Sequence, residues 1–446
     1  MTEAQHVVAV IGAGPAGLYA AKHLADHGVR VVLFNRDIKP GGLAEYGIYY
    51  NKYKMKLGLR KQFNRILSTD QITYYGNVMI GRQGDLQLAD LWKLGFQAIL
   101  VAVGAQGTKW LGLPGESLQG VYHAKDLVYH YNQLPPYSQQ EFAIGRRVTL
   151  IGVGNVMLDI AHWLTHDLKV DEVVAVARRG PAEVKFTKKE LGYVAQNLDL
   201  AALDTEFERV SDRMRAVGQD PQPAKDFILS GLENAQKANS ETRFRFDFFA
   251  SPKRILDDGQ GRVAGLEVED TELVTRDGDT KAVRLGTTRI LDVDTVVFCI
   301  GDKVDEAFGL PVEWNEYVKS ATPRFPVNDF SYEVFDPQGG KPIDGIFVAG
   351  WSREASSGLV GLARKDGESG AAAALQFLQA VAPAASVDAI LQGVEARLAG
   401  LPKPVIDKEA LQVLEAAEQA QAVRLGLEAF KFNSNEEMLA AIRSSW

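Results

Sequence analysis

Two glycine-rich turns constrain this chain more than any other feature of its sequence. The first reads GAGPAG at residues 12–17, and the second reads GVGNVM at residues 152–157. In dinucleotide-binding turns of this spacing, the first glycine permits a tight turn, the second lets the backbone approach a pyrophosphate, and the third lets helix and strand pack closely. Two such turns predict two bound dinucleotides, and a flavin with a nicotinamide is the natural pair for passing a hydride.

The first turn lies within a complete strand-turn-helix-strand pattern. Residues 6–11 are an unbroken apolar run typical of a buried parallel strand, and residues 30–34 form a second such run after a predicted helix. Gly12, Gly14 and Gly17 hold the three glycine positions. We therefore expect an anion at the N-terminus of the helix, where free N–H groups and the helix dipole favour negative charge.

The second turn repeats the pattern with one departure. A strand is predicted over residues 147–151, a helix from the turn to about residue 168, and a further strand over residues 172–177. Gly152 and Gly154 hold the first two glycine positions, but Met157 holds the third. The larger side chain predicts a wider contact between helix and strand, or a side chain turned away from it.

The residues that end the two second strands differ in chemistry. Asn35 stands where a carboxylate usually holds ribose hydroxyls, and its amide can still hydrogen-bond a hydroxyl. Arg178 and Arg179 end the other strand, and guanidinium groups bind phosphate bidentately and stay charged. The arginines favour NADP, with its 2′-phosphate, over NAD.

Length and composition fit a soluble enzyme with two α/β domains. The chain has 446 residues, 42 of them glycine, and a formal net charge of -8. No stretch approaches the roughly 20 apolar residues of a membrane span, and the first predicted strand begins too early to leave room for a signal peptide. We therefore expect a cytoplasmic protein without a membrane span. The negative charge, with no module of basic and aromatic residues, argues against nucleic-acid binding.

The single cysteine and the few histidines limit the chemistry further. Cys299 lies in the apolar run 294–300 and is expected to be an inert part of a buried strand. One cysteine cannot form a dithiol relay or an iron-sulfur centre within the chain. Two histidine pairs, 23/27 and 162/166, have the four-residue spacing of some metal sites but no carboxylate between them in the HExxH manner. No metal site is predicted.

The rest of the chain is discontinuous in its organisation. Residues 99–104 predict a buried strand, and residues 111–137 read as a connector punctuated by proline and glycine. A further strand is predicted over residues 345–349, followed by a helix over 370–381 and a helical tail.

Several sequence blocks together carry a specific resemblance. They include VIGAGPAGLYAAKHL, GNVMIGR, VYHYNQLP, GVGNVMLDIA, ARRGPAEVKFTKKEL, CIGDK and AGW, in this order and spacing, and the likeness reaches the closing EEMLAAI. The chain resembles the adrenodoxin-reductase type of ferredoxin-NADP reductase over nearly its whole length. The RRGP-x₄-FT-x-KEL block is much more specific than either glycine turn, and GLARKD at residues 361–366 suggests the bacterial branch.

The resemblance implies a set of cofactor contacts at matching positions. For FAD they are Gly12, Gly14, Ala16, Asn35, Gly42, Leu43, Val78, Trp351, Gly358, Leu359 and Val360. For NADP they are Gly154, Asn155, Val156, Arg178, Arg179 and Glu190. The Glu190 carboxylate would lie near the nicotinamide and could orient its carboxamide, whereas taken alone Glu190 reads as a charge on a helix surface.

Three positions depart from the family pattern. Asn35 replaces the ribose-binding carboxylate, and Lys52 occupies the position of a histidine that pairs with the acid near the nicotinamide. The segment 352–360 is less rich in glycine and proline than is usual beside the flavin ring. These departures bear on flavin potential, access and rate rather than on the fold.

A basic tract suggests how a partner would dock. Residues 46–69 contain no acidic residue and six basic ones, namely Lys52, Lys54, Lys56, Arg60, Lys61 and Arg65. Small ferredoxins are typically acidic, so a basic patch beside the flavin would steer and orient them. The alternative interpretation is a solvated helix face whose charge is balanced by neighbours in space.

These observations predict an α/β fold with two Rossmann-like domains of the three-layer ββα type. Residues 1–110 and 326–446 would form a discontinuous FAD domain with a helical tail, and residues 111–325 an inserted NADP domain. NADPH would give a hydride to FAD, which would pass single electrons to a ferredoxin or flavodoxin. Two alternatives stay open: an electron-input subunit like the small subunit of glutamate synthase, and a flavin-binding protein with little turnover.

Overall fold

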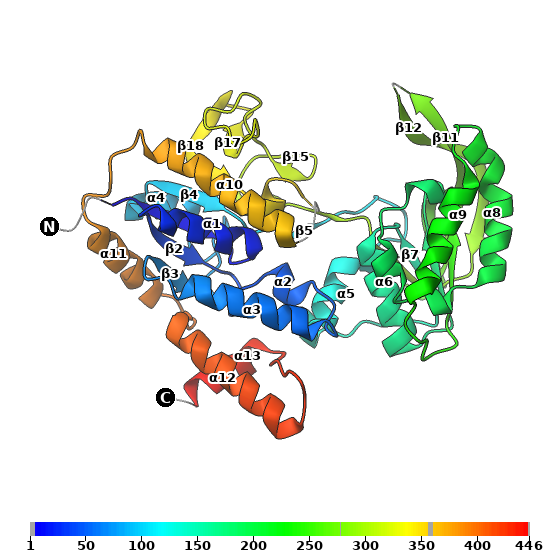
Figure 1. Cartoon of the computed structure of the whole chain (residues 1–446), viewed down its shortest axis with the longest axis horizontal. Coiled ribbons are helices and arrows are strands. Elements are labelled where there is room, and N and C mark those ends of the chain that lie inside the picture. Colours follow the sequence, from blue (N-terminus) through cyan, green and yellow to red (C-terminus); the bar gives the residue numbers. More distant parts are fainter. Residues whose placement is uncertain (1–4, 277, 356–359, 445–446) are drawn as a thin grey trace. The chain divides into compact units, whose positions relative to one another are not determined.

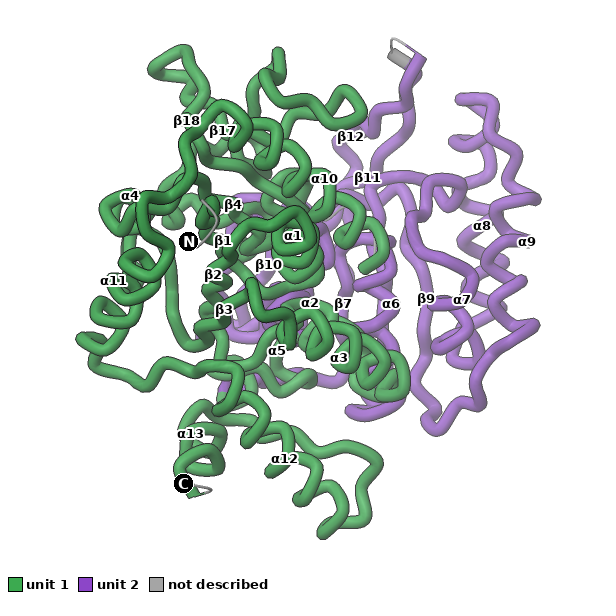
Figure 2. Tube along the Cα trace, turned by 60° about the vertical axis from the view of Figure 1, so that its left-hand side comes forward, with its two compact units in different colours: residues 1–108, 129–139, 302–446 green, residues 109–128, 140–301 purple. Residues whose placement is uncertain are grey.

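The structure, a computed structural model, describes residues 5–276, 278–355 and 360–444. The chain forms two compact units (Figure 2). Unit 1 comprises residues 1–108, 129–139 and 302–446, and unit 2 comprises residues 109–128 and 140–301. Unit 1 is therefore discontinuous, and both segments of unit 2 are inserted between its parts.

Unit 1 is built on a six-stranded sheet in the order β17-β18-β4-β1-β2-β3 (Figure 1). Neighbours from β18 to β3 are parallel, and only the edge strand β17 runs antiparallel to β18. The strands are β1 (Val7–Ile11), β2 (Arg30–Phe34), β3 (Ile72–Tyr75), β4 (Ala98–Val101), β17 (Glu333–Asp336) and β18 (Lys341–Val348). Their valine- and isoleucine-rich sequences suit a sheet that is covered on both faces.

Helices cover both faces of this sheet because alternate residues of each strand point to opposite sides. Val8 and Val10 pack in a cluster with α1, α3, α10, α12 and α13, whereas Val7, Ala9 and Ile11 pack in a cluster with α4 and α11. The helices of unit 1 are α1 (Pro15–Asp26), α2 (Leu43–Tyr46), α3 (Tyr53–Leu67), α4 (Leu88–Leu94), α10 (Val360–Leu378), α11 (Val387–Ala399), α12 (Lys408–Leu425) and α13 (Asn435–Arg443).

Short elements complete unit 1. Two-residue strands pair as β5 (Gly107–Thr108) with β14 (Asp302–Lys303) and as β15 (Val312–Glu313) with β16 (Glu316–Tyr317). Single 3₁₀ turns are η1 (Tyr137–Gln139), η6 (Glu306–Phe308) and η7 (Gly350–Ser352). The β5–β14 pair joins the point where the chain leaves unit 1 to the point where it returns.

Unit 2 contains a five-stranded parallel sheet in the order β6-β13-β7-β8-β9. One face of this sheet packs against a three-stranded antiparallel sheet, β10-β11-β12, through a shared apolar cluster. The strands are β6 (Val121–His123), β7 (Arg147–Ile151), β8 (Glu172–Val176), β9 (Arg243–Asp247), β10 (Ala250–Asp257), β11 (Val263–Arg276), β12 (Asp279–Leu291) and β13 (Thr295–Phe298). The two packed sheets, together with the helices of unit 2, form the expected three-layer arrangement.

The helical elements of unit 2 follow the strands of the parallel sheet. They are α6 (Asn155–His162), the π-helical turn η2 (Trp163–Leu168), η3 (Pro181–Glu183), α7 (Lys188–Leu191), η4 (Ala195–Asn197), α8 (Leu200–Arg215), α9 (Pro221–Leu229) and η5 (Ser230–Asn234). The helix α5 (Ala124–Tyr131) crosses the division between the units, since residues 129–131 belong to unit 1.

Several sequence expectations need correction. The predicted connector 111–137 contains β6 and the whole of α5, because its prolines and glycines lie outside these two elements. The predicted helix 370–381 belongs to the longer α10, which tolerates several glycines and ends at Leu378. Cys299 follows β13 rather than lying within it, and its side chain is half-buried. Burial nevertheless raises the pKa of its thiol, which opposes thiolate chemistry.

The expected domain boundaries differ from the observed division at two places. Residues 129–139 and 302–325 pack with unit 1, although the sequence pattern assigned them to the inserted domain. The first segment brings the Tyr129 and Leu134 side chains against Tyr46, and the second contributes Phe308 and Tyr317 to a unit 1 core cluster. Apolar contacts that are distant in sequence therefore decide where each unit ends.

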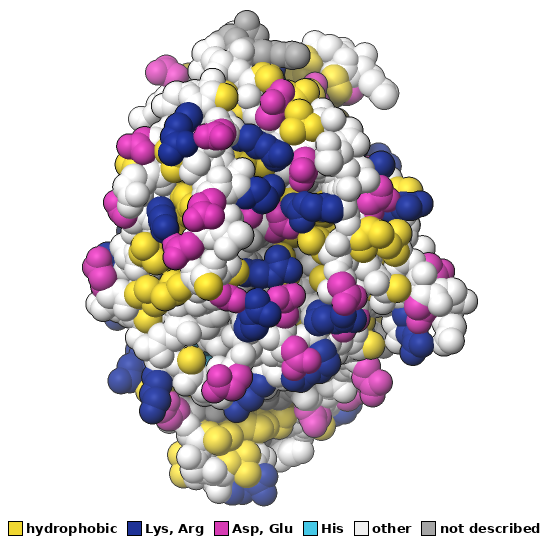
Figure 3. Space-filling view, turned by 90° about the vertical axis from the view of Figure 1, so that its right-hand side faces the viewer, with side chains coloured by type: hydrophobic (Ala, Val, Ile, Leu, Met, Phe, Trp, Pro, Cys, Tyr) yellow, Lys and Arg dark blue, Asp and Glu magenta, His cyan; other side chains and the backbone are white. Residues whose placement is uncertain are grey.

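The surface carries both signs of charge. Figure 3 shows basic and acidic side chains interspersed over the face turned to the viewer. Such mixing fits the ion pairs of unit 2, for example those of Arg243 with Asp199 and of Arg245 with Glu172. Within the described ranges, no helix has the length and apolar character needed to cross a membrane.

Candidate functional site

The first glycine turn follows β1 directly and leads into α1. Gly12 has φ +102°, and a Cβ there would lie 2.4 Å from the carbonyl oxygen of Ala102. A Cβ at Gly17 would lie 1.8 Å from the carbonyl oxygen of Gly12. Both positions therefore require glycine for packing within the protein, independently of any ligand.

Gly14 is glycine for a different reason. It caps α1 in an extended conformation without a side-chain capping bond, and the nearest atom to a Cβ added there is the Cα of Gly42, at 4.0 Å. Gly42 approaches so closely that its own Cβ would lie 3.0 Å from the Cα of Gly14. The N-terminus of α1 is thus bordered by bare backbone, which is what a bound pyrophosphate requires.

The side-chain amide of Asn35 hydrogen-bonds backbone groups of the protein. Its Oδ1 accepts a hydrogen bond from the Ala13 N–H at 3.0 Å, and its Nδ2 donates to the carbonyl oxygens of Asp37 and Lys39 at 2.8 and 3.0 Å. The residue is 7% exposed. Asn35 therefore ties the glycine turn to the segment after β2, and a contact with ribose stays a prediction.

Three apolar positions implied as flavin contacts surround this turn. Ala16 is buried in α1, Val78 is buried shortly after β3, and Leu43 is half-buried at the start of α2. The Val78 N–H donates to the carbonyl oxygen of Asn35 at 2.9 Å, so its backbone is already paired.

The segment after β18 is organised by a residue that sequence reasoning missed. The Asp366 carboxylate accepts hydrogen bonds from the Gly350 N–H at 2.6 Å and from Arg353 Nε at 2.8 Å. The Arg353 guanidinium also lies over the ring of Tyr332, 4.9 Å from its centroid. Asp366 thereby fixes the 3₁₀ turn that carries the half-buried Trp351. An acidic residue directly after two basic ones, in the sequence ARKDG, was the available signal.

The rest of the implied flavin segment is only partly described. Val360 begins α10 and packs against the core of unit 1. Gly358 and Leu359 lie outside the described residues.

The second glycine turn, in unit 2, repeats the geometry of the first. Gly152 has φ +124°, and a Cβ there would lie 2.4 Å from the carbonyl oxygen of Cys299. Gly154 caps α6 in an extended conformation, and no atom lies within 4 Å of a Cβ added there. Asn155 Oδ1 accepts from the Thr187 N–H at 2.9 Å, and Val156 is 44% exposed on the first turn of the helix.

Met157, at the third position of this turn, is fully buried. Both expectations, a wider contact between helix and strand and a side chain turned away from that contact, stay predictions. Its side chain fills space within unit 2 next to other buried residues of α6, such as Leu158 and Ile160.

The two arginines after β8 differ in their surroundings. Arg179 Nη1 forms an ion pair with Glu183 Oε2 at 2.8 Å and lies 3.5 Å from Thr280 Oγ1. Arg178 is exposed, and its guanidinium has no partner among the residues that the structure describes. Of the pair, Arg178 is the one whose charge is available to a phosphate.

Comparison with known proteins places these features in a family. Residues 6–204 match the family described as pyridine nucleotide-disulphide oxidoreductase. A probable ferredoxin/ferredoxin-NADP reductase of Mycobacterium tuberculosis is 30% identical, over 98% of this chain and 76% of that protein. The mitochondrial NADPH:adrenodoxin oxidoreductase of Arabidopsis thaliana is 28% identical, over 79% of this chain and 78% of the relative.

The chain belongs to the adrenodoxin-reductase type of ferredoxin-NADP reductases. Solved structures agree on the fold. FprA from Mycobacterium tuberculosis in complex with NADPH superposes with a TM-score of 0.81 at 24% identity, covering 98% of this chain and 99% of FprA. The expected α/β fold with two dinucleotide-binding domains is thereby confirmed.

Glu190 and Lys52, the candidate catalytic residues of this reductase, lie in different units. Glu190 is half-buried in α7, and its N–H donates to the Oγ1 of Thr187, the N-cap residue, at 3.3 Å. Because Thr187 also bonds Asn155, the Glu190 helix is anchored to the glycine turn of unit 2. Lys52 is half-buried at the N-cap of α3. Their roles stay predictions.

The basic tract of the reductase divides into two groups. Lys54, Lys61 and Arg65 are exposed on α3. Lys56 is 6% exposed, and Arg60 makes two hydrogen bonds to the buried Glu45, at 2.6 and 2.5 Å. Helical periodicity turns Lys56 and Arg60 away from the exposed face of α3. Because Lys56 is buried and Arg60 is paired with Glu45, these two residues do not fit the role of docking contacts.

The histidine pairs show no metal arrangement. The rings of His23 and His27 lie 4.6 Å apart, and those of His162 and His166 lie 5.2 Å apart. In the part of the chain that the structure describes, no three His, Cys, Asp or Glu side chains gather as a metal site would require. Burial and the neighbouring His27 lower the pKa of His23.

Proposed function

We propose that this protein binds FAD in unit 1 and NADP(H) in unit 2, and that it passes electrons from NADPH through the flavin to a ferredoxin. One observation carries the proposal: each unit presents a helix N-terminus, with a glycine at its N-cap, at the carboxyl end of a strand in a parallel sheet. Ligands of α/β sheets bind at this edge. The relatives named above are reductases of ferredoxin or adrenodoxin.

The residues of unit 1 fit the FAD pyrophosphate. Gly14 and Gly42 leave the N-terminus of α1 open, and the backbone N–H groups there have no side-chain cap. Trp351, Val360, Leu43 and Ala16 would supply apolar contacts. A bound flavin would supply the chemistry that joins two-electron donors to one-electron acceptors, and the residues of this chain would hold and orient it.

The residues of unit 2 fit NADP in the same way. Gly154 leaves the N-terminus of α6 open for the pyrophosphate, and Arg178 provides an exposed guanidinium after β8 for the 2′-phosphate. Glu190 would orient the nicotinamide carboxamide by accepting a hydrogen bond from its amide nitrogen.

We assign partner docking to the exposed cations of α3. Lys54, Lys61 and Arg65 have no acidic neighbour on their own helix, so they would attract an acidic ferredoxin or flavodoxin. Long-range attraction of this kind raises the association rate and is weakened by salt. The physiological direction of electron flow would depend on the partner's potential.

The first experiment asks whether the cofactors bind and react. The purified protein should show a flavin absorption spectrum, release FAD on denaturation, and bleach when NADPH is added without oxygen. NADH should bleach it far more slowly at equal concentration. A colourless protein that takes up no FAD would contradict the proposal, as would release of FMN.

The second experiment tests the docking surface. Reversing Lys54, Lys61 and Arg65 to Glu should slow NADPH-dependent reduction of ferredoxin, most strongly at low salt, because screening at about 0.15 M already limits exposed charges to roughly 8 Å. Reduction of ferricyanide, which needs no docking surface, is the first control, and Lys93→Glu, at an exposed lysine of α4, is the second. Wild-type ferredoxin rates at low salt would remove this helix face as the docking site.

A further inference from the structure

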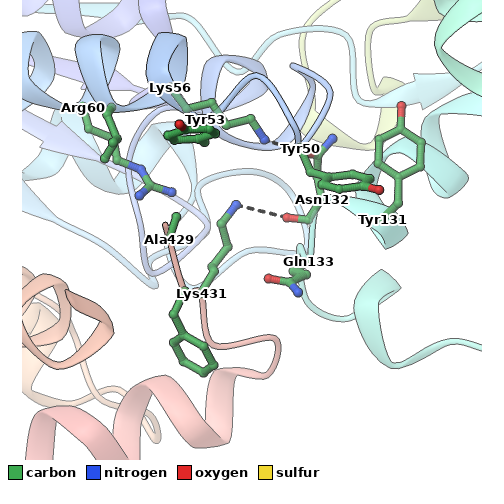
Figure 4. Close-up of a pocket in the computed structure, with 11 residues that line it drawn as sticks. Tyr50, Tyr53, Lys56, Arg60, Tyr131, Asn132, Gln133, Ala429 and Lys431 are labelled. Atoms are coloured by element: carbon green, nitrogen blue, oxygen red, sulfur yellow. Dashed lines mark hydrogen bonds between the residues drawn. The ribbon is translucent and has the colours of Figure 1, made fainter. Parts of the chain in front are cut away.

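A cavity in unit 1 lies between α3, the residues that follow α5, and the loop between α12 and α13 (Figure 4). Its volume is about 350 Å³. It shares no residue with the cofactor contacts proposed above. The charged side chains that line it, Lys56, Arg60 and Lys431, are all cations.

The cations converge on Asn132. Lys56 Nζ donates to Asn132 Oδ1 at 2.5 Å, and Lys431 Nζ donates to the Asn132 carbonyl oxygen at 3.1 Å. Figure 4 shows the two ammonium groups reaching this residue from α3 on one side and from the 429–431 segment on the other. Asn132 is 2% exposed. Its Nδ2 has no hydrogen-bond partner among the residues that the structure describes.

Nearby carboxylates balance only part of this charge. Glu45 pairs with both Arg60 and Lys431, while Glu418 pairs with Lys39 behind them. Lys56 has no carboxylate within ion-pair distance in the described part of the chain. The four cations Lys39, Lys56, Arg60 and Lys431 thus have two carboxylates between them. Burying the two remaining positive charges costs free energy unless a further anion binds.

Several donors are still available to such an anion. The bonds of Arg60 to Glu45 use Nε and Nη2, which leaves Nη1. Asn132 Nδ2 is unused, and each ammonium group has protons beyond those already bonded. Tyr50, Tyr53 and Phe430 add aromatic rings to the lining, beside the apolar side chain of Leu57.

We infer that this cavity is a binding site for a small organic oxyanion, a carboxylate or phosphate carried on an aromatic or apolar body. Lys56, Arg60, Lys431 and Asn132 Nδ2 would bind the anionic group, and the aromatic rings would cover its body. The inference does not rest on the proposed electron transfer, since it concerns a separate cavity.

The ionisation of Lys56 gives the site a pH dependence. Burial, followed by repulsion from Lys431, lowers the pKa of Lys56 to about 7. Burial also lowers the pKa of Lys431. A bound anion favours the charged lysine and raises its pKa, so binding should take up protons near and above neutral pH and weaken as pH rises.

Other ionisable groups surround Lys56. Arg60 and Tyr53 lie on α3, Glu45 and Tyr46 on α2, and Lys39, Tyr50, Tyr131 and Glu418 complete the surroundings. Burial alone would raise the pKa of Glu45, but Lys431 and Arg60 hold it below its usual value. Burial raises the pKa of Tyr46 further above neutrality. The expected proton uptake therefore belongs to the two lysines.

The test uses the purified full-length protein with four probes: benzoate, phenyl phosphate, inorganic phosphate and the neutral benzamide. Calorimetric titration at pH 6 and pH 8 in buffers of different ionisation enthalpy should show binding of benzoate or phenyl phosphate, tighter at pH 6, with proton uptake at pH 8. The organic anion that binds more tightly identifies the headgroup. Thermal unfolding should shift upward with the same probes.

Two variants remove the site in different ways. Lys56→Met deletes the unpaired cation, and Asn132→Asp places a carboxylate beside Lys56 that would replace the ligand's charge. Each should weaken binding at least tenfold, and Asn132→Asp should also raise the melting temperature without any ligand. Lys93→Met, which removes an exposed cation elsewhere, should leave binding unchanged.

Three results would overturn the inference. The first is no binding of either organic anion up to roughly 10 mM. The second is equal binding by the wild type, Lys56→Met and Asn132→Asp. The third is binding of benzamide or inorganic phosphate as tight as that of both organic anions, since the site requires the charge and the body together.

Discussion

The glycine turns of the two units are the same structure with different surroundings. Gly12 and Gly152 each lie against a carbonyl oxygen of the neighbouring strand segment, with the same 2.4 Å to a hypothetical Cβ, whereas Gly14 and Gly154 are open. The residues after the second strands differ: Asn35 is buried and bonded to its own turn, while Arg178 is exposed. The turn itself thus follows from backbone packing, and the residue after the second strand decides what a ligand meets.

The two turns are also braced differently. In unit 1 the Gly41 N–H donates to the Ala13 carbonyl oxygen at 2.7 Å, which brings a second glycine segment beside the turn. In unit 2 the Lys185 N–H donates to the Val153 carbonyl oxygen at 2.9 Å, and Thr187 bonds Asn155. The turn of unit 1 is therefore held by a glycine segment without side chains. The turn of unit 2 is held by the segment that leads into the helix of Glu190.

The largest expected effect separates the first glycine of each turn from the second. Gly12→Val and Gly152→Val should each destabilise the unit that carries them by roughly 3 kcal/mol or more, because a positive φ and a backbone clash combine. Gly14→Val and Gly154→Val, made as matched controls, should unfold near the wild-type temperature. Thermal unfolding of the four variants without cofactors measures this, and equal losses at all four positions would break the comparison.

Substitutions of the two open glycines, Gly14 and Gly154, should each affect the binding of a different cofactor. Gly14→Val should purify without flavin, because its side chain would occupy the space of the FAD pyrophosphate. Gly154→Val should keep its flavin and lose NADPH-dependent bleaching, while dithionite still reduces it. Flavin content and anaerobic reduction are the measurements. A yellow Gly14→Val protein would refute the assignment of FAD to unit 1.

The exposed and the paired arginine should differ in their effect on nucleotide choice. Arg178→Ala should weaken NADPH binding by about 1.5 to 3 kcal/mol and leave NADH binding nearly unchanged, since it removes a charge-assisted bond to phosphate. Arg179→Ala should have a smaller effect, because Glu183 already pairs with that guanidinium. Titrations of both variants with NADPH and NADH measure these affinities. A larger loss of NADPH affinity in Arg179→Ala than in Arg178→Ala would contradict the prediction.

The smallest effect concerns Asn35. Asn35→Asp would restore a carboxylate at the usual ribose-binding position, but it would remove the two bonds that Nδ2 donates to backbone carbonyl oxygens. We expect a loss of roughly 1 to 2 kcal/mol in stability and no gain in FAD affinity. Urea unfolding and flavin release measure the two quantities. Tighter flavin binding without loss of stability would show that the side chain faces the ligand.

The regular part of the fold was predictable because its signals are local. The predicted strands 30–34 and 147–151 coincide with β2 and β7, and both glycine turns stand where their spacing placed them. Helix α1 and strand β8 differ from expectation only at their ends.

The features that were missed depend on contacts distant in sequence. The burial of Lys56 depends on Asn132 and Lys431, which lie far from it in the sequence. The sequence shows that the tract has six basic residues, but it does not show which way each side chain points. The tract was therefore interpreted as a single basic surface. The role of Asp366 likewise appears only when α10 lies beside the Gly350 turn.

The inserted arrangement of unit 2 has a consequence for the growing chain. The parallel sheet of unit 2 is complete once β13 has been synthesised, whereas β4 of unit 1 must wait for β18, its neighbour on one side. The core of unit 1 also needs α10, α12 and α13 from the last third of the sequence. The middle of the sequence can thus assemble before its beginning is complete: on the ribosome, unit 2 can close while β4 still awaits β18.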